Sequence, residues 1–239
     1  MAGTILVILH RERSTPGRVG HMLRARGLTL DVRRPRFGDT LPETMEAHAG
    51  AIIFGGPASA NDEDDYMRAE IAWSAVPLKE QAPFLGICLG AQIMCRQLGG
   101  RVGEHPDGQV EIGYYPIRPT EAGADFGPWP RKVYQWHREG LDLPRGATLL
   151  AEGETFACQA FGYGPAAIGV QFHPEVSLAM MHRWTVRGAE RMALPGARPR
   201  EDHFAERHVH DAANVDWLRR LLDRWLASDA RHSRRLAAE

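Results

Sequence analysis

The segment around Cys88 has the residue types of a nucleophile held in a sharp turn. Cys88 lies between Gly86 and Gly90, at the end of a short apolar run. Glycines permit the backbone conformations and close approaches that a strand-to-helix turn of this kind needs. Such a turn projects its central side chain above a sheet, and the N–H groups of the following helix favour a thiolate and a developing oxyanion. The pattern predicts an elbow that presents a reactive sulfur.

A cysteine nucleophile needs a base, and the base needs a group that orients it. His173 and Glu175 lie two residues apart in Val-Gln-Phe-His-Pro-Glu, 85 residues after Cys88. At this spacing the imidazole can take the thiol proton while the carboxylate holds its tautomer. A glycine-flanked cysteine by itself is more often a small core residue, and His-Pro-Glu by itself is more often a turn. Their occurrence together favours catalysis.

The elements that would carry these residues alternate between strands and helices over the first hundred residues. Short β-branched apolar runs predict strands, and apolar residues at helical spacing predict helices. The predicted strands cover 4–10, 28–32, 50–57 and 82–88, and the predicted helices cover 17–27, 61–76 and 89–100. This alternation indicates a parallel sheet with helices on both faces.

The pattern changes after residue 100. The β-type segments 110–120, 147–156, 157–164 and 166–175 predict antiparallel or mixed additions to the sheet, and 214–227 predicts an amphipathic helix. The residues between them, 195–212, are polar and predicted to lie on the surface. We expect an α/β, flavodoxin-like fold with a mixed, mostly parallel sheet in a single domain. Its body would span 1–194, with 195–239 a polar segment plus a helix packed on the same domain.

Composition narrows the class of protein. With 239 residues, 44% of them hydrophobic, the chain can bury a full core, and a net charge of -1 gives no excess of positive charge for nucleic acid or an anionic membrane. The early apolar run 5–9 is too short to span a membrane and lacks the basic flank of a signal peptide. Three cysteines cannot form a paired framework. We therefore expect free thiols and a cytoplasmic protein.

Four segments, taken in order, resemble the class I, Cys-His-Glu type of glutamine amidotransferase. They are GGPASAND (55–62), LGICLGAQ (85–92), WHREGLDLP (136–144) and VQFHPE (170–175), and the resemblance extends over residues 3 to 190. The chain looks most like stand-alone members related to the glutaminase domain of GMP synthase. The resemblance implies the class I glutamine amidotransferase-like fold.

By position in these motifs, the resemblance implies that Cys88 is the nucleophile, His173 the general base and acid, and Glu175 its partner. The backbone N–H groups of Gly56 and Leu89 would form the oxyanion hole. The implied reaction is hydrolysis of the γ-amide of glutamine through a glutamyl thioester, with release of ammonia. It needs no metal and no organic cofactor.

The resemblance also implies a set of substrate contacts. Gly55 belongs to this set, and Gln92, one helical turn beyond the elbow, would contact the glutamyl end of the substrate. His137 is either a structural histidine or a substrate contact. The family follows it with a small residue, whereas this chain has Arg138 and then Glu139. Arg138 could point to solvent, narrow the pocket, or bind an extra carboxylate on a larger γ-glutamyl substrate.

Three functions follow from these features. A glutaminase would pass ammonia to a separate synthetase subunit, since this chain has no SGGxDS-type nucleotide-binding loop. A stand-alone hydrolase of γ-glutamyl amides or peptides would use the same chemistry, and Arg138 favours it. A non-catalytic regulatory subunit is disfavoured, because all three members of the triad are present.

Two other groups of residues receive structural interpretations. His203, His208 and His210 lie in a polar segment without a cysteine or an HExxH pattern, so we predict a solvated surface and no metal site. Cys95 is predicted to be a buried small residue rather than a resolving thiol.

Overall fold

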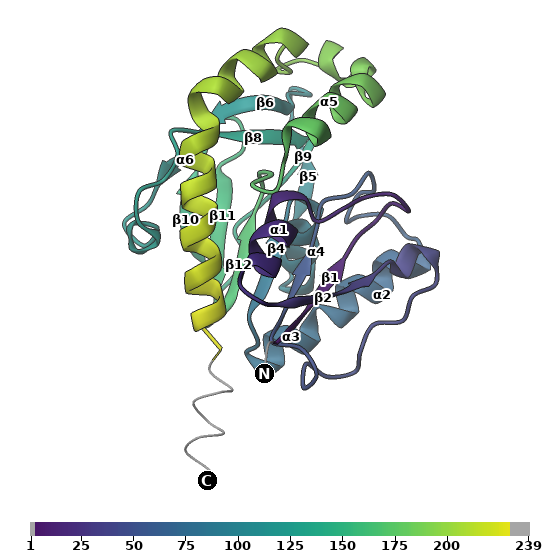
Figure 1. Cartoon of the computed structure of the whole chain (residues 1–239). Coiled ribbons are helices and arrows are strands. Elements are labelled where there is room, and N and C mark those ends of the chain that lie inside the picture. The colour runs from purple at the N-terminus through teal and green to yellow at the C-terminus, as the bar shows by residue number, and fades with distance from the viewer. Residues whose placement is uncertain (1–2, 230–239) are drawn as a thin grey trace.

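In the computed structural model, which describes residues 3–229, an eight-stranded sheet forms the centre of the molecule (Figure 1). In spatial order its strands are β2 (Thr29–Arg33), β1 (Thr4–Ile8), β3 (Gly50–Ile53), β4 (Phe84–Ile87), β12 (Ala167–Val170), β11 (Cys158–Tyr163), β10 (Thr148–Glu152) and β7 (Arg118–Pro119). The strands from β2 to β12 are parallel, and the last three continue the sheet by antiparallel pairing. The predicted mixed, mostly parallel sheet is confirmed.

Helices cover both faces of this sheet. The helix set consists of α1 (Gly17–Ala25), α2 (Asp65–Trp73), α3 (Ala75–Glu80), α4 (Leu89–Gln97), α5 (Leu178–Arg187) and α6 (Arg200–Ala227). Apolar residues of α1 and α6 pack on one face, and those of α2 and α4 pack on the other. Trp217 and Trp225 of α6 are 1% and 0% exposed. Burying a large apolar side chain contributes about 1.5–3 kcal/mol, so this packing fixes the strands that carry the site.

Two small sheets lie beside the main one. The first pairs β5 (Val102–Glu104) with β9 (Glu139–Leu141), and the second pairs β6 (Glu111–Pro116) with β8 (Lys132–His137). The prediction that segment 110–120 extends the main sheet is therefore wrong for β6, and only β7 joins that sheet. The reason is a separate small core, in which Tyr114 and Tyr134 pack against Met180 and Met181.

The last helix begins at Arg200 rather than at residue 214, so the polar segment before 214 is mostly helical. Its first half is held by polar contacts: Glu206 pairs with Lys132 at 2.8 Å, and Asp211 pairs with Arg18 at 2.8 Å. Ion pairs of this kind produce no apolar periodicity in the sequence, so the sequence did not predict this part of the helix. The division of the chain into 1–194 and 195–239 stays a prediction. Residues 1–2 and 230–239 of these two segments lie outside the described residues.

The other predicted helices and strands need smaller corrections. The helix predicted at 61–76 is two helices, α2 and α3, and Pro77 lies in the first turn of α3, where a missing N–H costs little. Strands β1 and β3 end at Ile8 and Ile53, earlier than predicted. Their following residues therefore form loops at the carboxyl edge of the parallel strands. Three short 3-10 helices complete the fold: η1 (Pro35–Phe37), η2 (Ala124–Phe126) and η3 (Ala189–Ala193).

Candidate active site

Cys88 lies at a strained turn between β4 and α4. Its backbone has φ 51° and ψ -107°, and it is one of two non-glycine residues with positive φ in the range 3–229. A side chain adopts such a conformation only when its surroundings impose it. A Cβ added to Gly90 would lie 2.0 Å from the carbonyl oxygen of Ile53, so only glycine allows α4 to approach β3 this closely. The elbow holds the sulfur at the carboxyl edge of the sheet.

His173 and Glu175 reach the same edge from β12. Because β12 runs parallel to β4, their carboxyl ends coincide, and the Cys88 N–H donates to the Val170 carbonyl at 2.8 Å. The His173 Nδ1 lies 2.8 Å from Oε1 of Glu175, and both side chains are buried. A Cβ built on Gly55 would lie 2.7 Å from His173 Cε1 and 3.5 Å from Cys88 Cβ. Three strand ends thus bring these residues together.

The surroundings of His173 favour its protonated form. Burial alone lowers the pKa of His173, but the Glu175 carboxylate and the Cys88 side chain outweigh burial and raise it to about 10. Its Nε2 is buried and has no hydrogen-bond partner elsewhere in the described chain. An imidazolium beside the sulfur stabilises negative charge on that sulfur. The arrangement can therefore hold a proton ready for a leaving group.

Gly55 and Gly56 follow β3 and pass directly over the elbow. A Cβ on Gly56 would meet His10 Cβ and Leu89 Cδ2, each at 2.8 Å, so only glycine fits between them. Leu89 is the first residue of α4, where backbone N–H groups have no partner inside the helix. Gly56 and Leu89, the two predicted oxyanion donors, therefore lie next to each other in the structure.

A buried pair that the sequence did not indicate supports this loop. His10 Nε2 lies 2.8 Å from Oε2 of Glu70, and His10 Nδ1 lies 3.3 Å from the carbonyl oxygen of Gly55. A backbone carbonyl can only accept, so Nδ1 of His10 donates the hydrogen bond to Gly55. The one available sequence signal was a histidine that ends an otherwise apolar strand. The pair anchors the backbone immediately before Gly56.

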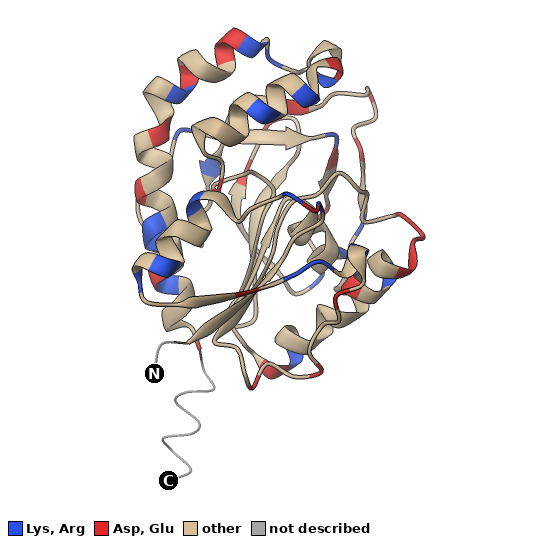
Figure 2. Ribbon diagram, turned by 45° about the vertical axis from the view of Figure 1, so that its right-hand side comes forward, with Lys and Arg blue, Asp and Glu red and all other residues tan. Residues whose placement is uncertain are grey.

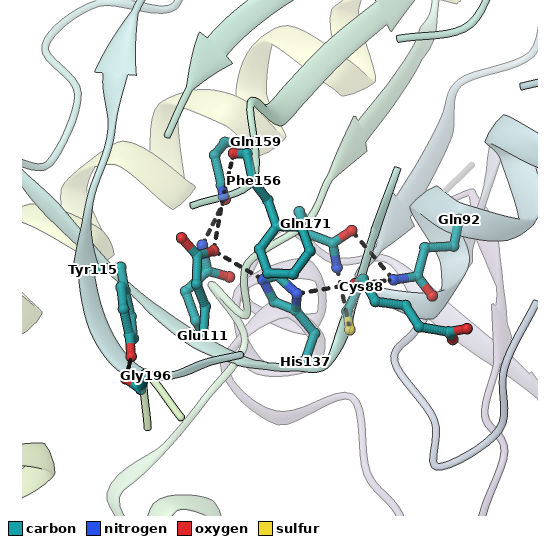
Figure 3. A network of polar contacts seen from close by, with 11 residues as sticks. Cys88, Gln92, Glu111, Tyr115, His137, Phe156, Gln159, Gln171 and Gly196 are labelled. Atoms are coloured by element: carbon teal, nitrogen blue, oxygen red, sulfur yellow. Dashed lines mark hydrogen bonds and ion pairs between the residues drawn. The ribbon is translucent and has the colours of Figure 1, made fainter. Parts of the chain in front are cut away.

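Gln92 and Gln171 link the elbow to the third motif (Figure 3). Gln92 Nε2 donates to the Glu139 carbonyl at 2.8 Å and to Gln171 Oε1 at 3.3 Å, and Gln171 Nε2 lies 3.7 Å from Cys88 Sγ. Sequence reasoning did not single out Gln171, although strand alternation places it on the same side as His173. Gln92, a predicted substrate contact, is thus already bound to protein groups.

His137 lies inside a buried polar network (Figure 3). Its Nε2 is 3.1 Å from a Glu111 oxygen, its Nδ1 is 3.0 Å from the Glu139 carbonyl, and Gln159 Nε2 donates to the same Glu111 oxygen at 2.9 Å. The edge of Phe156 also contacts the ring. Of the two roles considered for His137, these contacts favour the structural one: it shapes the backbone of residues 137–139.

Arg138 and Glu139 are placed differently from each other. Arg138 is exposed. The Glu139 carboxylate is half-buried and accepts from Ser59 Oγ at 2.9 Å and from Asn61 Nδ2 at 3.4 Å. Glu139 therefore ties the third motif to the first.

A cavity of about 690 Å³ lies beside His173 and Glu175. Gly55, Gly56, His173 and Glu175 line one part of it. Cavities of this size hold small organic ligands. Neither Gln92, His137, Arg138 nor Glu139 lines it.

The histidines near the start of α6 are placed only partly as predicted. His203 is fully buried and bonded to Tyr134 Oη at 2.9 Å and to the Arg198 carbonyl at 3.1 Å, so the predicted solvated position is wrong for it. His208 is exposed and His210 half-buried. Over residues 3–229, no group of three or more His, Cys, Asp or Glu side chains could hold a metal ion. Within the same range, no helix is long and apolar enough to cross a bilayer.

Comparisons with known proteins point to one family. Residues 12–187 match the family model for glutamine amidotransferase class-I. The chain is 33% identical over 219 residues to the glutamine amidotransferase-like protein YfeJ of Salmonella typhimurium, a match covering 87% of each chain. It is also 33% identical over 177 residues to the GMP synthase of Burkholderia vietnamiensis, covering 68% of this chain but only 31% of that protein.

A solved structure gives the same result for the fold. The crystal structure of a glutamine amido transferase from Methylobacillus flagellatus matches with a TM-score of 0.89 and 25% sequence identity, covering 95% of this chain and 96% of that one.

Proposed function

Because the chain belongs to the class I glutamine amidotransferase family, we propose that it hydrolyses a γ-glutamyl amide bond through a thioester on Cys88. One observation carries the proposal: the strained elbow at Cys88 and the buried His173–Glu175 pair converge at the edge of one sheet. Convergence of a nucleophile, a base and an orienting carboxylate is the arrangement that covalent catalysis requires.

The first step forms the thioester. The sulfur of Cys88 attacks the γ-carbonyl carbon, and the N–H groups of Gly56 and Leu89 stabilise the resulting oxyanion. The C–N bond then breaks as His173 gives its proton to the nitrogen, which leaves as ammonia or an amine. The raised pKa of His173 supports this role, since the ring holds a proton at neutral pH.

The second step restores the enzyme. His173, now neutral, takes a proton from water, and the water oxygen bonds to the thioester carbon. The bond from that carbon to the sulfur breaks, which releases glutamate and returns the thiolate and the imidazolium. Glu175 keeps Nδ1 of the ring protonated throughout, so that Nε2 faces the reacting atoms.

Two substrate classes are compatible with this chemistry. Free glutamine would yield ammonia, which a separate synthetase subunit would use, as the names of the GMP synthase relatives suggest. A stand-alone hydrolase would instead cleave a γ-glutamyl compound with a larger amine part. The 690 Å³ cavity that adjoins His173 favours the second class, because ammonia needs no such space. The complete triad disfavours a non-catalytic subunit.

The experiment that tests the proposal measures ammonia or amine release from glutamine and from a panel of γ-glutamyl amides. We expect release by the wild-type chain and none by Cys88→Ala or His173→Ala. A Cys88→Ala protein that folds and retains wild-type rates would contradict the proposal.

A further inference from the structure

The cavity beside His173 and Glu175 has a strongly basic wall. Six of its lining residues are arginines: Arg11, Arg13, Arg36, Arg183, Arg187 and Arg191. They come from three separate parts of the chain, namely the loop after β1, η1, and α5 with η3. Basic segments are visible on α5 and on the loops that follow the first strands (Figure 2). Three glutamates also line the cavity, one of them the triad's Glu175, so positive charge is in excess.

Most of these arginines lack a carboxylate partner among residues 3–229. In the described part of the chain, only Arg191 of the six has an ion pair, with Glu190 at 4.0 Å. Neighbouring arginines outside the cavity are paired closely: Arg18 with Asp211 at 2.8 Å and Arg33 with Asp31 at 2.7 Å. Five guanidinium groups that have no ion pair within the described residues therefore line one cavity.

The arginines lie close enough to repel one another. Burial lowers the pKa of Arg11, and the charges of Arg191, Arg187 and Arg36 lower it further. Like charges gathered around one cavity repel one another, and a bound anion offsets this repulsion. Guanidinium groups bind carboxylates and phosphates with paired hydrogen bonds, which suits them to that role.

The cavity also adjoins the residue that would protonate the leaving group. His173 lines it, and His173 is the residue that protonates the departing nitrogen. The residues implied for the glutamyl end, Gln92 and the backbone around Arg138, are not part of its lining. An amine part larger than ammonia would therefore extend from His173 into the cavity, toward the arginines.

We propose that the arginine-lined cavity is a subsite for an anionic group, carboxylate or phosphonate-like, on the amine part of a γ-glutamyl substrate. The subsite rests on the proposed function for its orientation, because His173 must face the leaving nitrogen. It assigns selection of the charged substrate to Arg11, Arg187 and their neighbours rather than to Arg138, which lies outside the cavity.

Binding to the Cys88→Ala protein tests the subsite without turnover. The probes are γ-glutamyl-β-alanine, γ-glutamyl-2-aminoethylphosphonate and the uncharged γ-glutamyl-propylamide, titrated by calorimetry. We expect at least one charged probe to bind at least tenfold more tightly than the neutral probe. The better of the two charged probes identifies the anion. Equal affinities for all three probes would overturn the subsite even if the chain proved inactive.

Arginine variants test which residues produce the preference for a charged probe. Arg187→Gln and Arg11→Gln, each combined with Cys88→Ala, should lower the charged-to-neutral affinity ratio at least fivefold. Arg24→Gln is the matched control, because Arg24 is an exposed arginine on α1 outside this cavity. It should keep the ratio of the parent protein. A ratio that is unchanged in both cavity variants would also overturn the subsite.

Kinetics separate this inference from the proposed function. In the otherwise unmodified chain, kcat/KM should favour the charged amide over the neutral one by at least tenfold. Hydrolysis of glutamine and of the neutral amide without that preference would refute the subsite alone. Tight, arginine-dependent binding of a charged probe without any hydrolysis would refute the proposed function and leave the subsite standing.

Discussion

His10 and Glu70 form a buried pair beneath the glycines that follow β3, with Nε2 of His10 2.8 Å from Oε2 of Glu70. The other ring nitrogen of His10 faces the Gly55 carbonyl, so the pair fixes the backbone that leads into Gly56. A preorganised N–H donor is useful only if its direction is held. In the proposed mechanism, the pair would therefore act as a positioning device for the loop that carries the Gly56 N–H.

Glu70→Gln keeps the shape of the side chain but removes its charge. We expect kcat to fall about tenfold, which corresponds to about 1.4 kcal/mol of transition-state stabilisation, with KM changed much less. Steady-state kinetics on the preferred γ-glutamyl substrate measure this split. Glu63 is exposed and lies just before α2, the helix that contains Glu70. Glu63→Gln is therefore the control and should leave kcat and KM unchanged. A loss of thermal stability with unchanged kcat would assign Glu70 a purely structural role.

Cysteine labelling distinguishes the elbow from the two other thiols. Burial raises the pKa of both Cys95 and Cys158 to about 12, so each stays a thiol at neutral pH. We expect a glutamine-like chloroketone to alkylate Cys88 and to spare the other two. Peptide mass mapping after limited labelling provides the measurement, and adducts mainly on Cys95 or Cys158 would argue against the elbow.

The backbone conformation at the elbow predicts opposite effects on stability for substitutions at residues 88 and 90. Glycine adopts the positive φ of Cys88 without strain, so Cys88→Gly should keep the free energy of unfolding within about 1 kcal/mol of the wild-type value. Gly90→Ala should lower it by about 2 kcal/mol or more, because the new Cβ would meet the Ile53 carbonyl.

Chemical denaturation of the two variants and of Gly103→Ala tests this. Gly103 has open space around it and serves as the control for a tolerated change. Similar losses at residues 90 and 103 would show that the close approach at Gly90 is not needed.

The raised pKa of His173 also predicts how stability depends on pH. Because its folded-state pKa of about 10 lies above the unfolded value near 6.5, its contribution is complete below pH 6.5 and is lost as pH rises through 10. The difference in unfolding free energy between the wild type and His173→Gln should therefore shrink between pH 6.5 and 10. Denaturant titrations at several pH values measure it, and a difference that grows with pH would contradict the ion pairing of His173.

Local signals were sufficient to predict the elements that form the parallel sheet. Short apolar runs marked β1, β3 and β4, since parallel strands buried on both faces consist almost wholly of apolar residues. The turn at Cys88 was predictable because glycines at 86 and 90 leave few alternatives. His173 and Glu175 were predictable as a pair because only one residue separates them in the sequence.

Contacts between distant segments were not predictable in the same way. His10 meets Glu70 only after α2 packs on the sheet, and the one sequence signal was the histidine at the end of an apolar run. The first half of α6 makes ion pairs with Arg18 and Lys132, which hydropathy does not register. The arginines of the cavity come from three segments, so their convergence appears only in three dimensions.

The most direct test of the account is detection of the covalent intermediate on Cys88. Wild-type protein is mixed with excess γ-glutamyl substrate, quenched in acid during turnover, digested and examined by mass spectrometry. The account predicts a glutamyl group on the peptide that contains Cys88, which disappears as substrate is exhausted. Turnover that proceeds with no glutamyl adduct on that peptide, and at an unchanged rate in Cys88→Ala, would contradict it.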